Sequence, residues 1–139
     1  MYNPYSLQGK TILVTGASSG IGQSVAIECS KLGAFVVITG RNQDRLQETF
    51  GMLEGSGHIQ IPADLSDYSE IQKLVEQCPK VDGVSHNAGI AKIIPVKFIS
   101  SETLEEIVGT NAFGPILLTQ ALIRKKKINT NGSIVFTLY

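Results

Sequence analysis

The sequence predicts an α/β fold in which a doubly wound parallel sheet carries helices on both faces. Three observations predict it. Short apolar, β-branched segments alternate with longer segments of helical periodicity along the 139 residues. Tight hairpin signals between the apolar segments are lacking, which favours parallel pairing through helical crossovers. The first apolar segment, residues 11–15, enters a glycine-rich turn that opens a helical segment, as expected for a strand, a turn and a helix.

The expected strands and helices alternate along the chain. Apolar residues at near-helical spacing follow the first strand, with Gly33 as the stop signal. Ser66 is the expected N-cap of the third helix. The long fourth helix ends in the cations of residues 125–127, which suit its negative pole and form a solvated face. The expected strands are residues 11–15, 34–40, 58–64, 81–89 and 132–139, and the expected helices are residues 21–33, 42–53, 67–78 and 101–127.

Length and composition limit the class of protein. A chain of 139 residues, 42% of them hydrophobic, fits one domain with its own core, residues 1–139. Lys plus Arg equals Asp plus Glu at 12 each, so no basic footprint for nucleic acid exists. Neither a signal region nor an apolar run of about 18 residues occurs, so we expect a cytoplasmic protein with no membrane partner. Cys29 and Cys78 lie far apart in expected helices, which indicates neither a disulfide nor a metal site.

The glycine-rich turn has the pattern T-G-x-x-x-G-x-G, with Gly16, Gly20 and Gly22. Glycine permits a positive φ and a close approach of the backbone to a ligand. The helix that follows directs unpaired N–H groups and its positive pole toward an anion, and a pyrophosphate fits this description. The spacing matches neither G-x-G-x-x-G nor the phosphate loop G-x-x-x-x-G-K-[ST]. The alternative interpretation is that this segment is only a glycine-rich connector between the strand and the helix and binds no ligand.

Four motifs together resemble the short-chain dehydrogenase/reductase superfamily. They are TGASSGIG after the first strand, ADLS after the third, HNAG after the fourth and TNAFGPILLTQA in the long helix. They extend over nearly the whole chain. The resemblance implies a Rossmann-type, three-layer fold that binds a nicotinamide dinucleotide. Members of the superfamily are longer, so the resemblance also implies that five strands are present and the C-terminal strands are missing from these 139 residues.

The resemblance assigns cofactor-binding roles at the expected strand ends. Asp64 would accept a hydrogen bond from the adenine amino group; alternatively it only helps to start the next helix. Asn87 would bond within the sheet beside the cofactor ribose; alternatively it is a locally bonded residue at a glycine-containing strand end. His58 and His86 receive no role. The implied cofactor-binding residues are Gly16, Ser18, Ser19, Gly20, Ile21, Gly22, Asp64, Leu65, Asn87, Ala88 and Gly89.

The end of the second strand bears on cofactor choice. Enzymes that prefer NAD usually carry an acidic residue there for the ribose 2′-hydroxyl, whereas an arginine accommodates the 2′-phosphate of NADP. This chain has Gly40 followed by Arg41. A guanidinium can bind a phosphate through two parallel hydrogen bonds. We therefore expect Arg41 to bind the cofactor and NADP(H) to be that cofactor. A solvated charge at a strand exit is the alternative.

The catalytic residues that the resemblance implies are only partly present. Asn111 matches the family's asparagine, which is thought to hold a water in the proton path. The family's serine, tyrosine and lysine have no counterpart, because Leu138 and Tyr139 stand where serines are expected and no Y-x-x-x-K follows. The implied reaction is reduction of a carbonyl in a small molecule or an acyl thioester, for example a 3-oxoacyl thioester. The alternative is a truncated, non-catalytic nucleotide-binding module, and the 139-residue chain alone is expected to be inactive.

The long helix also bears on assembly. Residues 104–123 are apolar over more than one stripe, which is typical of burial on two sides. Full-length members of the superfamily that this chain resembles commonly form subunit pairs through this helix. We therefore expect a homo-oligomer.

Overall fold

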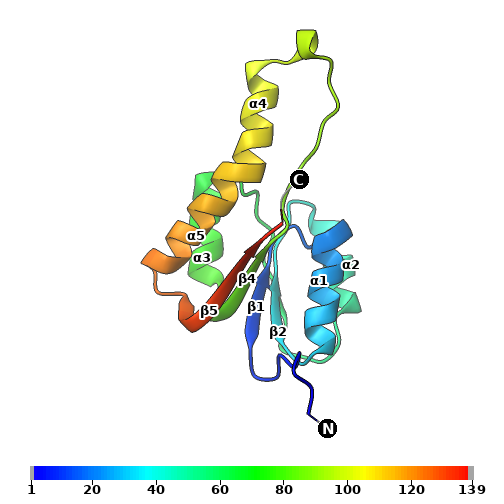
Figure 1. Cartoon of the computed structure of the whole chain (residues 1–139), viewed down its shortest axis with the longest axis vertical. Coiled ribbons are helices and arrows are strands. Elements are labelled where there is room, and N and C mark those ends of the chain that lie inside the picture. Colours follow the sequence, from blue (N-terminus) through cyan, green and yellow to red (C-terminus); the bar gives the residue numbers. More distant parts are fainter. Residues whose placement is uncertain (1, 138–139) are drawn as a thin grey trace.

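The central element of the fold is one parallel sheet (Figure 1). The computed structural model describes residues 2–137. Its strands are β1 (Thr11–Val14), β2 (Phe35–Ile38), β3 (Ile59–Gln60), β4 (Val81–His86) and β5 (Ile128–Phe136). They form one five-stranded sheet in the order β3-β2-β1-β4-β5, and every neighbouring pair is parallel. The order reverses between β1 and β4, as in a doubly wound sheet, so the predicted fold class is confirmed.

Helices cover both faces of this sheet. They are α1 (Gly20–Lys31), α2 (Gln43–Met52), α3 (Tyr68–Gln77), α4 (Ser101–Val108) and α5 (Gly114–Arg124). Figure 1 shows α1 and α2 on one side of the sheet and α3 and α5 on the other. α4 and the loop before it, which contains a short 3₁₀ helix (Val96–Phe98), extend past the end of the sheet.

Two hydrophobic clusters hold the three layers together. In β2, Val37 faces the cluster shared with α3 and α5, whereas Val36 and Ile38 face the cluster shared with α1 and α2. This alternation follows from the two-residue period of a strand. Leu13 and Val14 of β1 divide between the two clusters in the same way, and both are fully buried. Because both faces are buried, the central strands are almost continuously apolar, as a parallel sheet requires.

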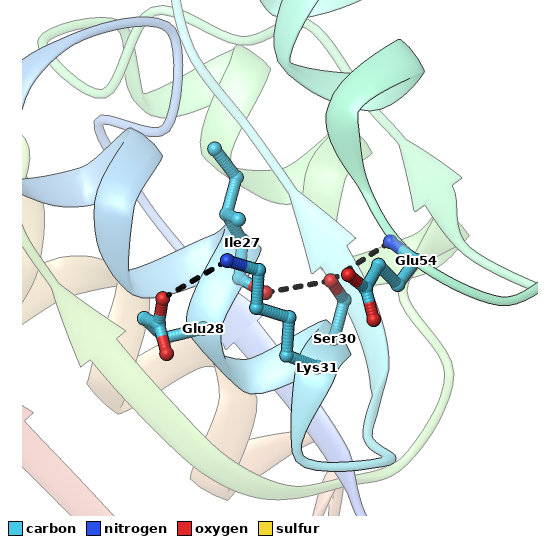
Figure 2. Close-up of polar contacts among 5 residues, drawn as sticks. All are labelled: Ile27, Glu28, Ser30, Lys31 and Glu54. Atoms are coloured by element: carbon cyan, nitrogen blue, oxygen red, sulfur yellow. Dashed lines mark hydrogen bonds and ion pairs between the residues drawn. The ribbon is translucent and has the colours of Figure 1, made fainter.

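A buried serine joins the end of α1 to the segment that follows α2 (Figure 2). The Ser30 hydroxyl donates to the Ile27 carbonyl at 2.7 Å and accepts from the Glu54 N–H at 3.0 Å. Nearby, Lys31 and Glu28 form an exposed ion pair at 3.5 Å. That ion pair lies within α1 and contributes about 1 kcal/mol at most, so of these contacts the Ser30 hydroxyl is the one that joins α1 to the segment after α2.

The long helix predicted for residues 101–127 is interrupted, so that prediction was wrong in part. α4 ends at Val108, and a π-helical turn (Gly109–Phe113) separates it from α5. The start of α5 passes close to the loop after β3, where a Cβ on Gly114 would lie 2.7 Å from the Leu65 carbonyl oxygen. Periodicity in the sequence does not reveal a π turn, because a single extra residue shifts the apolar stripe only slightly.

The last three strands also differ in extent from their predictions: β3 is limited to Ile59–Gln60 within the predicted 58–64, and β4 ends at His86 rather than at residue 89. β5 begins at Ile128 rather than at residue 132, because a bulge lies within it. Val81 pairs with Ile128 and Gly83 with Ser133, so the strand carries extra residues between these pairs. Asn131 lies in this bulge with a φ of 65°, a left-handed conformation that asparagine tolerates better than most residues.

Two smaller predictions are corrected. The N-cap of α3 is Asp67, whose carboxylate accepts from the Ser69 N–H, and not Ser66. Lys127 is not part of a solvated cationic face, because its amino group donates to the Cys78 carbonyl at 2.7 Å. This contact ties the start of β5 to the end of α3.

Residues 138 and 139 lie outside the described part of the chain, so the expectation that Leu138 and Tyr139 replace catalytic serines has no structural test. Among residues 2–137, no helix is long and apolar enough to cross a membrane. The same residues contain no group of three or more His, Cys, Asp or Glu side chains placed to hold a metal ion.

Candidate functional site

A cleft of about 780 Å³ opens at the carboxyl ends of β1, β2 and β4. Its position beside the reversal of strand order is the usual ligand site of a doubly wound sheet. Its walls come from the glycine-rich loop after β1, the start of α2, the loop after β3, the loop after β4 and the π-helical turn. The lining residues are Gly16, Ser18, Ser19, Gly20, Ile21, Thr39, Gly40, Arg41, Asn42, Arg45, Ala63, Leu65, Asn87, Ala88, Gly89, Ile90 and Thr110.

Two glycines let the glycine-rich loop pack directly on backbone. Gly16 has a φ of 61°, and a Cβ there would lie 2.7 Å from backbone atoms of Asn87 and Ala88. Behind it, a Cβ on Gly22 would lie 2.1 Å from the Gly16 carbonyl oxygen. Gly22 does not line the cleft; it permits the close packing of α1 against the loop. The loop conformation therefore depends on the absence of side chains at both positions.

Gly20 has a different surrounding from these two glycines. Its φ is 58°, but a Cβ there would meet nothing within 4 Å. The residue opens α1, and Ser19, its N-cap, makes no side-chain capping bond. The first N–H groups of α1 thus lie at the cleft without a side-chain cap, where they can bind an anion. Ile21, 52% exposed, forms the rim of the same wall.

Hydrogen bonds among residues at the ends of β1, β4 and β5 hold the loop in place. The Thr15 hydroxyl accepts from the N–H groups of Asn87 and Ala88, at 3.0 and 3.2 Å. The Asn87 amide donates to Ser85, through the carbonyl at 3.0 Å and the hydroxyl at 2.9 Å, and accepts from the Thr137 hydroxyl at 2.9 Å. These bonds fix the amide orientation of Asn87 and join β1, β4 and the end of β5 at the floor of the cleft.

Thr49 of α2 holds the glycine-rich loop from the other side. Its hydroxyl, fully buried, donates to the Ala17 carbonyl at 2.8 Å and accepts from the Gln23 amide at 3.0 Å. The Ala17 N–H in turn donates to the Thr39 carbonyl at 3.1 Å. The loop is therefore fixed to α1, α2 and the end of β2 by hydrogen bonds that are buried or partly buried.

The start of α2 brings two arginines to the cleft. Arg41 and Arg45 both line it and both are exposed, and within residues 2–137 neither guanidinium has a hydrogen-bonding or ion-pair partner. Asn42 caps the helix by accepting from the Arg45 N–H at 3.0 Å. A Cβ on Gly40 would lie 3.0 Å from the Ser18 hydroxyl oxygen, so a side chain at this strand end would require Ser18 to shift. The result is an unpaired cationic wall.

The loop after β3 contributes an apolar wall. Ala63 and Leu65 are buried and line the cleft. Asp64, between them, does not line it. The Asp64 carboxylate accepts from the Ser66 N–H at 2.9 Å and from the Ser66 hydroxyl at 2.6 Å, both through the same oxygen. One carboxylate oxygen is thus used in the local turn.

Asn111 lies in the π-helical turn and does not line the cleft. Its amide accepts from the Ile90 N–H at 2.7 Å and donates to the Ile90 carbonyl at 2.8 Å. Ile90 does line the cleft, so Asn111 holds the backbone of its rim. The ion pair of Lys92 with Glu106 also joins the loop after β4 to α4.

The titratable groups near the cleft do not include a proton donor. Arg41 and Arg45 are the ionisable residues of the described lining, and an arginine side chain keeps its proton in proteins. His86 lies next to Asn87 but not in the lining; burial lowers its pKa to about 4, so its ring is neutral at pH 7. Its Nε2 lies 2.8 Å from the Thr119 hydroxyl, and its ring stacks on Phe136. The described cleft can bind an anionic ligand, but it supplies no acid.

Some lining residues were not predicted from the sequence. Arg45 could have been found, because the helix predicted for residues 42–53 places it in the first turn, close behind Arg41 and the strand end. Thr39, Thr110 and Ile90 carry no such signal: only the folded chain shows that they reach the cleft. The other lining residues that were not predicted are Gly40, Asn42 and Ala63.

Comparisons with known proteins agree on one family. The family model described as short chain dehydrogenase matches residues 10–138. A 3-oxoacyl-[acyl-carrier-protein] reductase of Rickettsia bellii is 33% identical over 129 residues, which cover 93% of this chain and 53% of the relative. A 3-ketodihydrosphingosine reductase of Bos taurus is 31% identical over 144 residues, which cover 96% of this chain and 43% of the relative. The crystal structure of a short chain dehydrogenase from Shigella flexneri superposes with a TM-score of 0.84 at 31% identity, covering 97% of this chain and 58% of that one.

The chain spans about half the length of the curated relatives it matches. The matched half contains the glycine-rich loop, both arginines and the loop after β4. It is therefore the half that holds the cleft.

Proposed function

Because this chain belongs to the short chain dehydrogenase family, whose members use a nicotinamide cofactor, we propose that its cleft binds NADP(H) for the reduction of a carbonyl. The observation that carries the proposal is the unpaired guanidinium of Arg41 at the end of β2, beside a glycine-rich loop and an uncapped helix start. When bound, the nicotinamide supplies the hydride.

The residues of the cleft fit a dinucleotide. The free N–H groups at the start of α1 suit a pyrophosphate, and Gly20 leaves that approach open. Asn87, Ala88 and Gly89 offer a backbone-lined floor for a ribose. The buried hydroxyls of Thr39 and Thr110 have no protein partner in the described part of the chain, so both are available to a ligand in the cleft.

The cationic wall supports NADP(H) over NAD(H). A 2′-phosphate carries charge that Arg41 can bind through two parallel hydrogen bonds. NAD-preferring enzymes have an acidic residue at this strand end. In this chain a side chain at Gly40 would require Ser18 to shift, because its Cβ would lie 3.0 Å from the Ser18 hydroxyl oxygen. Arg45 lines the same cleft and adds a second cation that would favour a dianion.

Replacing Arg41 with alanine is expected to reduce the preference for NADPH over NADH by about tenfold. A charge-assisted hydrogen bond to phosphate contributes about 1.5–3 kcal/mol, and solvent exposure moves the effect toward the lower end. Calorimetric dissociation constants for both cofactors, in wild type and in Arg41→Ala, measure the change. Arg124→Ala, which removes an exposed arginine at the end of α5, is the matched control and should leave the ratio unchanged. An unchanged ratio in Arg41→Ala would remove that residue from the site.

The proposed substrate carries a carbonyl, with a 3-oxoacyl thioester as the first candidate. The support is the name of one relative, a 3-oxoacyl-[acyl-carrier-protein] reductase, and the 3-keto group named in another, a 3-ketodihydrosphingosine reductase. In this account the role of Asn111 is to hold the Ile90 segment at the rim of the cleft, so that the substrate side has a fixed wall. Asp64 would meet the adenine through its second carboxylate oxygen.

The alternative is a nucleotide-binding module without chemistry. One observation favours it: the described cleft has no ionisable proton donor.

A homo-oligomer remains part of the proposal. Its support is the set of apolar side chains that α4, the π-helical turn and α5 leave exposed, namely Leu104, Val108, Phe113, Ile116, Leu117 and Ile123.

A further inference from the structure

The outer edge of β5 has no neighbouring strand in the described part of the chain. β3 and β5 are the outermost strands of the sheet. β3 is two residues long and offers little to pair with, whereas β5 has nine residues. Its last part, residues 132–137, follows the bulge and contains no charged side chain and no proline, which are features that usually protect such an edge. An open, uncharged edge of this kind is a template for another strand.

The backbone groups that point away from β4 belong to Ile134 and Phe136. The Thr137 N–H donates to the His86 carbonyl at 2.9 Å, so the backbone of Thr137 faces β4. Successive residues of a strand direct their N–H and C=O groups to alternate edges, so Val135 also faces β4. Ile134 and Phe136 alternate with these residues. Each of the two therefore offers one donor and one acceptor to a second strand.

Both faces of this part of β5 leave apolar side chains partly uncovered. Val135 is 57% exposed and Phe136 is 48% exposed. Ile134 packs against the cluster shared with α3 and α5, so Val135, its neighbour, points to the opposite face of the sheet. Phe136 lies on the same face as Ile134, where its ring stacks on His86. Apolar surface is therefore open on each side of the strand.

We propose that two copies of this chain pair through β5, in an antiparallel arrangement centred on Val135. In this register Ile134 of each copy lies opposite Phe136 of the other, and the outward N–H and C=O groups of these residues bond to one another. Val135 lies opposite Val135 of the second copy, at the closely spaced position between these pairs. The strand is thus complementary to itself, as a twofold interface requires, and the two sheets become one continuous sheet.

The side chains support a second copy as the partner. The register forms two contacts between Ile134 and Phe136, and an aromatic side chain beside a β-branched one is a favourable cross-strand pair. On the other face it brings two exposed valines together. No charge is buried, because residues 132–137 carry none.

The extent of the chain also supports a second copy. The match to the short chain dehydrogenase family ends at residue 138, just past β5, and this chain covers 53% of the Rickettsia bellii relative. In the 139-residue chain, no described strand competes with a second copy for this edge.

This interface differs from the helical one in the proposed function. That interface uses exposed apolar side chains of α4, the π-helical turn and α5, whereas pairing through β5 uses backbone hydrogen bonds at the end of the sheet. The inference also does not depend on the proposed cofactor. The two interfaces and the cofactor can therefore be tested separately.

Sedimentation velocity of the 139-residue chain, from about 1 to about 200 μM, tests the pairing over a range suited to a small interface. We expect a monomer–dimer equilibrium in wild type. Val135→Lys and Val135→Glu each place like charges opposite one another and remove the central apolar contact, so each should weaken association about tenfold or more. An equimolar mixture of the two variants places opposite charges together and should restore the dimer.

The control for the helical interface is Ile116→Lys. It places a lysine on the exposed side of α5 and weakens any association through the helices. The measurements are made in the wild-type background and repeated with Ile116→Lys. The effects of both Val135 changes, and the recovery on mixing, should be the same in the two backgrounds.

A cysteine substitution tests the register. In Val135→Cys the two introduced sulfurs lie at the closely spaced position, where Cα atoms about 4.5 Å apart permit a disulfide, so oxidation should give a covalent dimer. Ser133→Cys is the matched control, because it lies on the same face but its two copies are about 13 Å apart in this register. The native Cys29 and Cys78 occur in both variants and in wild type, so any cross-link through them appears equally in all three.

Several results would overturn the inference: a monomer throughout the range in both backgrounds, a dimer that Val135→Lys leaves intact, a mixture that fails to recover, or equal cross-linking by Ser133→Cys. NADPH binding and the melting temperature at low concentration are measured for every variant. Val135 is exposed and lies outside the cleft lining, so its variants should match wild type in both. A wild type that dimerises through β5 but binds no NADPH would contradict the proposed function and leave this inference standing.

Discussion

Replacing Gly22 with alanine is expected to weaken NADPH binding by on the order of 100-fold, the scale on which misplacement by about 1 Å affects a site. The new Cβ would lie 2.1 Å from the carbonyl oxygen and 2.6 Å from the carbonyl carbon of Gly16. These are backbone atoms, so the overlap cannot be relieved by a side-chain rotation. Either α1 or the glycine-rich loop must move, and both carry the groups proposed to bind the pyrophosphate. Calorimetry with NADPH measures the loss.

The same change should also destabilise the fold by about 1–3 kcal/mol, the usual scale of overpacking in a close-packed region. Chemical denaturation measures this loss. Gly51→Ala is the matched control, because Gly51 lies in α2 and a Cβ there meets nothing within 4 Å. That variant should gain about 0.5–1 kcal/mol from helix propensity and bind NADPH as wild type does. Tight binding by Gly22→Ala would show that the loop does not hold the dinucleotide.

The 139-residue chain assayed alone is expected to show no measurable carbonyl reduction, even where it binds NADPH. A developing alkoxide needs a proton donor, and general acid catalysis typically contributes about 10²- to 10⁴-fold. The described lining offers only Arg41 and Arg45, which keep their protons. The Asn111 amide is bonded to Ile90 and has no acidic proton. Binding without turnover is therefore the expected behaviour.

The assay follows NADPH oxidation by mass-verified protein with a 3-oxoacyl thioester and with small diketones. A parallel calorimetric titration establishes that the protein in the assay binds NADPH, so that inactivity is not mistaken for misfolding. Asn111→Ala and Tyr139→Phe are run beside wild type. Robust turnover that either substitution abolishes would contradict the expectation and identify the residue on which the acid depends.

The fold class was predictable because its signals are local and repeated. Apolar β-branched segments such as residues 34–40 alternate with helical segments, and each turn between them carries its own glycine or capping residue. Once all strands pair in parallel, the rules for connections between strands leave only a few possible strand orders. Extents were less predictable. The start of β5 departs from its prediction because a bulge at Asn131 depends on pairing with β4, a contact distant in sequence.

The part of the cleft that could be predicted is the part made of motif residues. Gly16, Ser18 and Arg41 lie at strand ends, where the sequence places them and where the structure shows the cleft. Thr39 and Thr110 could not be predicted, since each is one ordinary threonine within an apolar segment. What distinguishes them is the absence of a partner after folding, which involves β2, the π-helical turn and the loop after β3 together.

The central claim is that the cleft at the carboxyl ends of β1, β2 and β4 holds the dinucleotide. Titration of isotope-labelled protein with NADPH, followed by the NMR shifts of its backbone amides, tests this claim residue by residue. We expect a saturable response whose largest shifts fall on Ser19, Gly20, Arg41 and Gly89, with little change in the second groove, between α3 and α5, at Gln72 and Gln120. Shifts confined to that second groove, or no saturable shifts with NADPH, would contradict the account.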